Sequence, residues 1–340
     1  MDVQNLMRPL LGVTGLSLAL AVMAAVLDRP VNQIAPPQTL LADYAAQIDE
    51  SARLEMTHGM GISGTRKIIV AQKDGQWVLP QRRNYPANQE LVTETLLALA
   101  DLKALEARTA KPEWHTALGL GVPEELGRAV RFKVSDAAGD ALAGLLLGRE
   151  QESEAEAKQE VKNYGSELRQ FYVRRADTAQ SWLARGRLPR NANFAAWMDP
   201  ALPKHDLAAL TAVDFEAGEG PFRLVRVGTD GWSLSGGAGW LAGFAALRPD
   251  DVALAETINF DTARTMRLNY ADGLQISYAN VGAATVIWAG ISAKADKDAS
   301  AAVKAEAAAI NARYAKWALR FDAARAAILL PARANLQAAN

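Results

Sequence analysis

Two segments of the chain share one pattern of alternating apolar and polar residues around an Asp-Gly pair. Residues 66–73 alternate before Asp74-Gly75, and residues 222–228 alternate before Asp230-Gly231. Alternation with a period of two is typical of half-buried strands. Glycine accepts the positive φ that a tight hairpin turn requires, and aspartate tolerates it. Each segment is therefore predicted to be a β-hairpin, and in both the second strand begins with a tryptophan.

The similarity extends on both sides of the hairpins. In each copy a predicted strand precedes the hairpin, an apolar helix follows it, and further strands close the unit. The first copy comprises strand 52–57, helix 88–107 and strands 129–136, 141–148, 170–175 and 180–184, and the second comprises strand 211–216, helix 238–247 and strands 265–271, 274–280 and 284–291. This order predicts an α+β fold of two tandem repeats, each an antiparallel sheet with a helix covering one face.

The two predicted helices begin differently. Leucines recur at nearly helical spacing between residues 88 and 107, and Asn88 is the candidate N-cap. The second helix follows the glycine-rich run Ser235-Gly236-Gly237. A glycine loop before a helix can bind phosphate through free N–H groups. Neither the lysine nor the Ser/Thr of a P-loop follows, so we interpret the run as a structural junction.

Two segments separate or interrupt the repeats. Residues 149–169 are dense in Glu and Lys and have no counterpart in the second copy, which indicates a solvated insert or, alternatively, a charged docking segment. Residues 189–204 contain three prolines and are predicted to link the repeats. The first repeat then covers residues 39–188, with the insert at 149–169, and the second covers residues 205–295.

The amino terminus carries an uncharged stretch, residues 9–27. As a helix it would be about 28 Å long, close to the thickness of a bilayer core. We therefore predict a membrane anchor within residues 1–29, followed by a proline-rich extended spacer at 30–38. Two alternatives remain open, a buried core helix and a cleaved signal peptide in which Val22 and Ala24 would occupy the small-residue positions.

Charges beside the stretch indicate its orientation only weakly. Arg8 precedes it, whereas Arg29 on the far side is offset by Asp28. The positive-inside rule then favours a cytoplasmic amino terminus. This predicts a single-pass protein of the bacterial inner membrane with its bulk in the periplasm.

The carboxy-terminal segment, residues 296–340, changes character. Apolar residues lie on one face of a predicted amphipathic helix: Val303, Ile310, Tyr314, Trp317, Phe321 and Ile328. Arg313, Lys316 and Arg320 lie on neighbouring turns, and Pro331 can end the helix. Packing against the second sheet is the favoured interpretation, and binding to an anionic membrane surface is the alternative.

Overall composition excludes several classes of protein. The 37 Lys and Arg residues balance 38 Asp and Glu, so the formal charge is −1 and there is no basic surplus to bind nucleic acid. The chain has no cysteine and hence no disulfide, thiolate nucleophile or Cys-ligated metal. Half of the residues are apolar and 22% are charged, as in globular proteins.

No motif for catalysis stands out. His58, His115 and His205 lie in separate segments without metal-ligand spacing, and His58 and His205 fit exposed loop histidines. The nucleophile motif GxSxG is absent. The carboxylate pairs Glu124-Glu125 and Asp250-Asp251 fit turns or helix starts. We therefore assign no catalytic, cofactor-binding or metal-binding residue and predict that the protein is not an enzyme.

The chain contains eight tryptophans, which admit two interpretations. Indole rings can form stacking platforms for ligands, but they also fill cores. Trp77 and Trp232 occupy equivalent positions in the two hairpins, and four others lie in apolar surroundings: Trp182, Trp197, Trp240 and Trp288. We predict that they belong mainly to the core.

Several motifs together resemble a known bacterial family. They are the amino-terminal apolar stretch, Lys67–Val70 with Asp74–Leu79, Tyr85-Pro86-Ala87-Asn88 before the leucine-rich helix, Leu118–Pro123, Leu147-Gly148 and Phe171–Arg174. The chain in this respect resembles the family catalogued as domain of unknown function 4340, over most of residues 40–260. A Pro-Ala-Asp helix start is usual in that family, and Asn88 here keeps a capping side chain. The resemblance implies a single-span envelope protein associated with ABC-type transport or gliding-motility-like auxiliary systems, and it carries no catalytic residues.

Three functional hypotheses follow. The first is a non-enzymatic, membrane-anchored extracytoplasmic scaffold or accessory component of an ABC-type transporter complex. The alternative is a periplasmic module that binds a ligand in the cleft between the two repeats, with tryptophans as stacking platform. The third, a hydrolase assembled from scattered residues, has the least support in the sequence.

Overall fold

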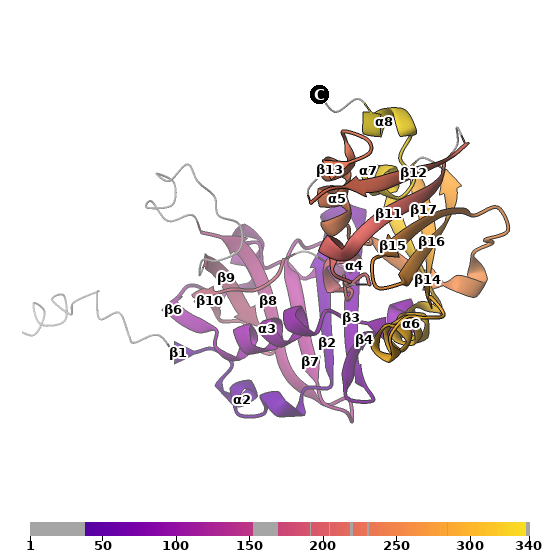
Figure 1. The fold of residues 1–340 in the computed structure, drawn as a ribbon. Coiled ribbons are helices and arrows are strands. Elements are labelled where there is room, and N and C mark those ends of the chain that lie inside the picture. Colours follow the sequence, from indigo (N-terminus) through magenta and orange to yellow (C-terminus); the bar gives the residue numbers. More distant parts are fainter. Residues whose placement is uncertain are drawn as a thin grey trace, which may run out of the picture.

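Two antiparallel sheets lie beside one another in the molecule (Figure 1). The computed structural model describes residues 38–151, 169–190, 192–203, 205–217, 220–229, 231–283 and 285–337. The first sheet has ten strands and the second has eight. The mixed α+β class with antiparallel sheets is therefore confirmed.

The first sheet belongs to the amino-terminal half of the chain. Its strands are β1 (Gln38–Thr39), β2 (Arg53–Gly59), β3 (Thr65–Lys73), β4 (Gln76–Leu79), β5 (Tyr85–Pro86), β6 (Lys103–Ala107), β7 (Val130–Ser135), β8 (Ala141–Glu150), β9 (Arg169–Arg175) and β10 (Ser181–Gly186). Its helices are α2 (Ala42–Ala45) and α3 (Gln89–Ala100). Helix α3 lies across one face of this sheet (Figure 1), and Val92, Leu96 and Leu99 are buried there.

The second sheet is built from the carboxy-terminal half. Its strands are β11 (Leu210–Ala217), β12 (Gly220–Val227), β13 (Gly231–Trp232), β14 (Asp251–Leu254), β15 (Arg264–Tyr270), β16 (Leu274–Ala283), β17 (Val286–Ala295) and β18 (Trp317–Asp322). The helices are α5 (Gly237–Ala245), α6 (Ala301–Tyr314), α7 (Ala323–Leu329) and α8 (Arg333–Gln337), and α4 (Phe194–Trp197) lies in the linker between the halves.

The order of strands is the same in both sheets. The first runs β1-β6-β10-β9-β8-β7-β2-β3-β4-β5 and the second runs β14-β18-β17-β16-β15-β11-β12-β13. When β1 and β5 are set aside, each strand of one sheet has a partner at the same place in the other. Helices α3 and α5 also follow equivalent strands, β4 and β13. Among the described residues the two sheets therefore repeat one strand order, and the second copy continues to β18, beyond its predicted end at residue 295.

Register and hydrogen bonding support the same alignment. Trp77 pairs with Gln72 across the first hairpin, and Trp232 pairs with Arg226 across the second. The side chain of Gln72 donates a hydrogen bond of 3.1 Å to the carbonyl of Ser51. At the equivalent place, Arg226 Nε donates one of 2.8 Å to the carbonyl of Leu210. Two different side chains thus bind the same backbone position of the repeat.

The cores of the two repeats fill similar space with exchanged residues. Met56 faces Phe132 in the first sheet, whereas Phe215 faces Met266 in the second, and all four are buried. Exchanging a large and a smaller side chain across a pair conserves volume, which cores tolerate well. Beside these pairs, the first repeat has Leu145 and Leu147 on β8 and the second has Tyr278 and Asn280 on β16.

The first hairpin has the predicted turn and the second does not. Asp74 and Gly75 both have positive φ, 51° and 77°, as a two-residue turn of this kind requires. In the second hairpin Gly231 already belongs to β13, and Gly228 takes the positive φ of 65°. The connection is therefore one residue longer than predicted, and Asp230 lies outside the described residues.

The predicted helix 88–107 is too long. Helix α3 ends at Ala100, and Lys103–Ala107 form strand β6, which pairs with β10 and β1. Leu102 and Leu105 continue the three-residue spacing of the leucines in α3, but this part of the chain is extended because it pairs with distant strands. Asn88 is the N-cap as predicted, since its side chain accepts a hydrogen bond from the N–H of Leu91.

The predicted carboxy-terminal amphipathic helix is wrong beyond Tyr314. Helix α6 ends there, and Trp317–Asp322 form β18, a strand inside the second sheet between β17 and β14. Residues four apart share a face in a helix and also in a strand. Trp317 and Phe321 therefore fit both periods, and the pattern alone did not separate them.

Several predictions lie outside the described residues. They are the anchor at 1–29, most of the spacer 30–38 and the insert between residues 152 and 168. Arg149 and Glu150 of the predicted insert belong to β8, and Arg169 belongs to β9. Among the helices that the structure describes, none has the length and apolar character to cross a membrane.

The two repeats meet through unlike ends of their sheets. Strands β4 and β5, at one end of the first sheet, face β14 and β18, at the opposite end of the repeat pattern in the second. The ring of Tyr85 on β5 meets that of Trp317 on β18 edge to face, with centroids 5.1 Å apart. The arrangement is therefore head to tail.

Candidate functional site

A cleft opens where the linker passes between the repeats. Its volume is about 520 Å³, and three segments line it: the start of α3 (residues 87–90), the linker (residues 199–203, 205 and 207) and the end of α5 with the residues after it (244, 245, 247 and 248). This is the cleft between repeats that the ligand-binding hypothesis requires, and among the described residues that line it the aromatic rings are those of Phe244 and His205.

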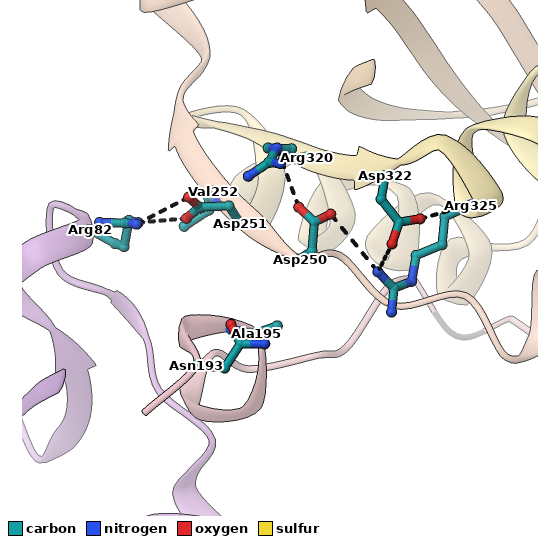
Figure 2. A network of polar contacts seen from close by, with 9 residues as sticks. All are labelled: Arg82, Asn193, Ala195, Asp250, Asp251, Val252, Arg320, Asp322 and Arg325. Carbon is teal, nitrogen blue, oxygen red and sulfur yellow. Dashed lines mark hydrogen bonds and ion pairs between the residues drawn. The ribbon is translucent and has the colours of Figure 1, made fainter. Parts of the chain in front are cut away.

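The linker is fixed to the first repeat by its backbone. Met198 forms an isolated β-bridge with Ala87, and the N–H of Asn88 donates to the carbonyl of Trp197 over 2.9 Å. The short helix α4 begins after Asn193, whose side chain accepts a hydrogen bond from the N–H of Ala195 (Figure 2). Trp197, the last residue of that helix, is fully buried. This part of the linker is therefore a packed part of the fold rather than a free connection.

His205 fixes the other end of the linker to the second repeat. Its Nε2 lies 3.1 Å from Asp272 Oδ2, its Nδ1 lies 3.0 Å from Glu306 Oε1, and its ring meets Tyr270 edge to face. The side chain is only 13% exposed, so the prediction of an exposed loop histidine is wrong here. The two carboxylates approach opposite nitrogens of one ring, so His205 joins the linker to the residues after β15 and to α6.

The other histidines are separate from this site. His115 is buried and its Nε2 lies 2.9 Å from the carbonyl of Ala179. His58 is half-buried near the end of β2, and burial lowers its pKa, as do Arg190 and Arg66. Within the described part of the chain, no three His, Asp or Glu side chains are grouped so that they could hold a metal ion.

Internal contacts occupy most polar side chains of the cleft. Asp199 pairs with Arg313 at 2.6 Å, and the hydroxyl of Tyr314 donates to the carbonyl of Ala201 over 2.7 Å. Burial raises the pKa of Tyr314 to about 12, so the hydroxyl keeps its proton in neutral solution. The side chain of Gln89 both donates to and accepts from the backbone of Trp77. The contacts of Arg313 and Tyr314 fix the linker to α6 of the second repeat. We call the region where the linker and the two repeats meet the joint.

A network of charged side chains joins the first repeat to β14 and the end of β18 (Figure 2). Arg82 donates two hydrogen bonds to Asp251, with Nε–Oδ1 at 2.5 Å and Nη2–Oδ2 at 3.0 Å. The guanidinium also stacks 3.8 Å from the centroid of the Phe194 ring in α4. One side chain of the first repeat thus contacts both the linker and the second repeat.

Removing this side chain should loosen the joint. We expect Arg82→Ala to lower the free energy of unfolding by about 1–2 kcal/mol, because a bidentate, partly buried ion pair and a cation–π contact are lost together. Urea denaturation measures the change. Arg83→Ala is the matched control, because the neighbouring Arg83 is exposed and should change stability by less than about 0.5 kcal/mol. Equal losses in both variants would contradict the role of Arg82.

Asp250 lies next to the Arg82–Asp251 pair, and its own carboxylate is less well paired. Its carboxylate faces Arg320 at 3.6 Å and Arg325 at 3.9 Å, distances too long for good hydrogen bonds. Burial is the largest influence on its pKa and raises it above the ordinary aspartate value, despite the two arginines. The ionised form is therefore less favourable in the folded protein than in the unfolded chain.

This raised pKa predicts a pH-dependent effect of substitution. Between the two pKa values the folded state binds more protons than the unfolded chain, so the contribution of Asp250 to stability declines as the pH rises through that window. We expect Asp250→Asn to be more stable than wild type at neutral pH and to lose this advantage on acidification. Urea titrations at several pH values test it. Asp177→Asn should behave oppositely, because a hydrogen bond from Arg175 lowers the pKa of Asp177.

The tryptophans are distributed as core residues. Trp77, Trp197 and Trp240 are buried, Trp182, Trp232, Trp288 and Trp317 are half-buried, and Trp114 is 58% exposed. None of them lines the cleft. The tryptophan platform of the ligand-binding hypothesis is therefore not at this site.

The glycine-rich run forms a close-packed junction, as predicted. The N–H of Gly236 donates to the carbonyl of Leu336 over 2.7 Å, and that of Gly237 donates to the carbonyl of Leu234 over 3.0 Å. A Cβ on Gly237 would lie 2.4 Å from the side chain of Trp232. Both N–H groups already have backbone acceptors, and glycine is required by the packing.

Sequence reasoning did not identify the residues of the joint. Arg82, Phe194 and Asp251 come from three distant segments, and no local motif brings them together. The pair Asp250-Asp251 was interpreted as a turn, and these residues do lie where the chain enters β14. Glu124-Glu125 lie in a short 3-10 turn, as predicted.

Comparison with known proteins gives one match. The family model described as "Domain of unknown function (DUF4340)" matches residues 77–265, more than half of the chain. The matched region runs from β4 to β15 and so includes the linker and the cleft. No curated protein matches the chain. No solved structure matches it either.

Proposed function

The chain belongs to the family described as domain of unknown function DUF4340, and from this membership we propose that it is a membrane-anchored extracytoplasmic scaffold. It would serve without chemistry of its own as an accessory component of an ABC-type transport system. Residues 9–27 would anchor it in the bacterial inner membrane as a single span, with both repeats in the periplasm.

The observation that supports this proposal most is the construction of the joint. The side chains that could contact a ligand in the cleft, including Asp199, Gln89 and His205, are bound to other parts of the protein. The core is continuous from one sheet to the other. A rigid body that carries two broad sheets suits a protein that positions partners, because its surfaces keep fixed relative positions.

The test combines topology with capture of partners. A carboxy-terminal tag should be cleaved by protease added to spheroplasts, and mild detergent extraction should recover the permease and ATPase subunits of an ABC transporter with the tagged chain. The matched control carries Leu16→Asp and Leu20→Asp, which interrupt the apolar stretch. A protected tag, or equal recovery of transporter subunits with the control, would overturn the proposal.

Ligand binding in the cleft remains the second candidate because one carboxylate there is free. Glu90 is exposed at the start of α3, and it has no ion-pair partner among the residues that the structure describes. A cationic or amine-bearing ligand would suit it. Thermal-shift screening with polyamines and basic peptides should raise the Tm of wild type more than that of Glu90→Gln, and an equal effect on both would remove this candidate.

A further inference from the structure

Two loops form one tip at an end of the first sheet. We define the apolar tip as residues 60–64, which join β2 to β3, together with residues 122–128, which precede β7. Backbone hydrogen bonds join the loops, from the N–H of Gly61 to the carbonyl of Gly127 over 3.4 Å and from that of Gly59 to the carbonyl of Ala129 over 3.0 Å. The two loops therefore behave as a single structural unit.

Large aliphatic side chains project from this unit into solvent. Ile62 is 95% exposed and Leu126 is 65% exposed. Single exposed apolar residues are common on protein surfaces. Here the two come from loops whose backbones are neighbours, since the Cβ position of Gly61 is 3.8 Å from the carbonyl oxygen of Leu126. Leu126 also has a φ of 61°, a left-handed conformation that is unusual for leucine.

Close glycine contacts lie at the base of the tip. A Cβ on Gly127 would lie 2.0 Å from the carbonyl oxygen of Gly121, and one on Gly59 would lie 2.2 Å from that of Gly127. Both contacts are with backbone atoms, which cannot move aside cheaply. The loops are thus packed backbone to backbone, and larger residues at these glycines would push them apart.

The surroundings of the tip are positively charged. Arg66 and Arg128 are exposed, and neither pairs with a carboxylate among the residues that the structure describes. Arg128 lies close to the tip, with Nε 3.5 Å from the Cβ position of Gly61. Glu125 is the exposed acid beside Leu126, whereas Glu124 pairs with Arg131. The excess of arginine would repel a second copy of the tip and attract an anionic surface.

Strand β1 lies level with the end of β8 that is beside the tip. Gln38 pairs with Ala104, which pairs with Ala184, and Ala184 pairs in turn with Phe171. Phe171 pairs with Glu150, at the end of β8 that adjoins the tip. The first described residue therefore lies level with the tip, and β1 runs toward the tip end of the sheet.

We propose that the apolar tip rests on an anionic membrane surface, with Ile62 and Leu126 among the headgroups and Arg66 and Arg128 on lipid phosphates. Apolar side chains beside cations are the combination that binds peripheral proteins to anionic bilayers. The proposal rests on the proposed function in one respect, since contact of the tip would orient the anchored repeats at the same membrane.

The test separates the tip from the anchor in the full-length chain. Vesicles are made of phosphatidylcholine alone or of an equal mixture with phosphatidylglycerol, and binding is measured by flotation. With the anchor interrupted by Leu16→Asp and Leu20→Asp, the chain should still float with the mixed vesicles and not with phosphatidylcholine. Adding Ile62→Ser and Leu126→Asn should reduce this binding at least fivefold, and asparagine tolerates the left-handed backbone.

Two controls make the result specific. Leu97→Gln removes a comparable exposed aliphatic group from α3 and should leave flotation unchanged. Because the chain has no cysteine, Ile62→Cys can be labelled with an environment-sensitive dye and compared with Ala138→Cys, in the β7–β8 turn at the opposite end of the sheet. The mixed vesicles should shift the emission at residue 62 and leave it unchanged at residue 138.

The outcomes distinguish the two proposals. An intact chain that floats while the dye at residue 62 stays in water would overturn the tip proposal and leave the anchor standing. An emission shift at residue 62, with equal flotation of the intact and anchor-interrupted chains on phosphatidylcholine, would support the tip and contradict the anchor. Undiminished flotation of the tip variant would overturn the tip proposal.

Discussion

Trp197→Ala should lower the free energy of unfolding by about 3–5 kcal/mol, the range for truncating a fully buried aromatic side chain. Trp197 is completely buried and belongs to neither sheet. It ends the four-residue helix α4, which is too short to be stable without tertiary contacts. The cavity would therefore form in the linker, beside its backbone contacts with Ala87 and Asn88.

The position of the residue also predicts how the protein unfolds. Loss of the Trp197 side chain should weaken the coupling between the two repeats. Urea unfolding followed by circular dichroism should then broaden or separate into two steps. Trp114→Ala is the matched control, because Trp114 is 58% exposed and should change stability by less than about 0.5 kcal/mol. A Trp197→Ala protein that unfolds like wild type would contradict the account of the joint.

Asn280→Leu should stabilise the protein by about 1–3 kcal/mol, the cost of an unsatisfied buried polar atom. Asn280 is fully buried, and its Oδ1 has no hydrogen-bond partner, although its Nδ2 donates to the carbonyl of Tyr278. The equivalent position in the first repeat is Leu147, also fully buried. The first repeat shows that this place in the fold accommodates leucine.

Tyr278→Phe should act in the same direction with a smaller effect. The hydroxyl of Tyr278 is buried without a partner, and burial raises its pKa well above the ordinary tyrosine value. Tyr314→Phe provides the control of opposite sign, because its hydroxyl donates to the carbonyl of Ala201. Thermal and urea denaturation measure all three variants. A loss of stability in Asn280→Leu would show that the amide has a partner that the leucine removes.

The repeat could be predicted from sequence because its signals are local. Alternation, an Asp-Gly pair and a tryptophan at the same offset placed both hairpins, and the register of Trp77 and Trp232 confirms the alignment. The match of strand order goes further than the prediction did, since β6 and β14 were not predicted as strands. They are short edge-side strands whose pairing depends on residues far along the chain.

The sequence-based prediction failed where the helical and the strand periods coincide. In residues 315–322 apolar positions four apart satisfy a helix and a strand equally, and only pairing with β17 and β14 decides. The cleft and its contacts were beyond sequence reasoning for another reason, because Arg82 and Asp251 are 169 residues apart and the packing of the linker alone brings them together.

The head-to-tail joint gives the molecule a direction. A two-fold symmetric joint would bring the same end of both repeats together. Here the β4–β5 end of the first sheet meets the β14 end of the second, and the two unlike ends at β1 and β13 remain outside the joint. Because the remaining ends are unlike, a further repeat could be added through the same head-to-tail contact. A gene that copied one more repeat in frame would add a third sheet without inventing a new interface, so members of differing length are an expected product of this architecture.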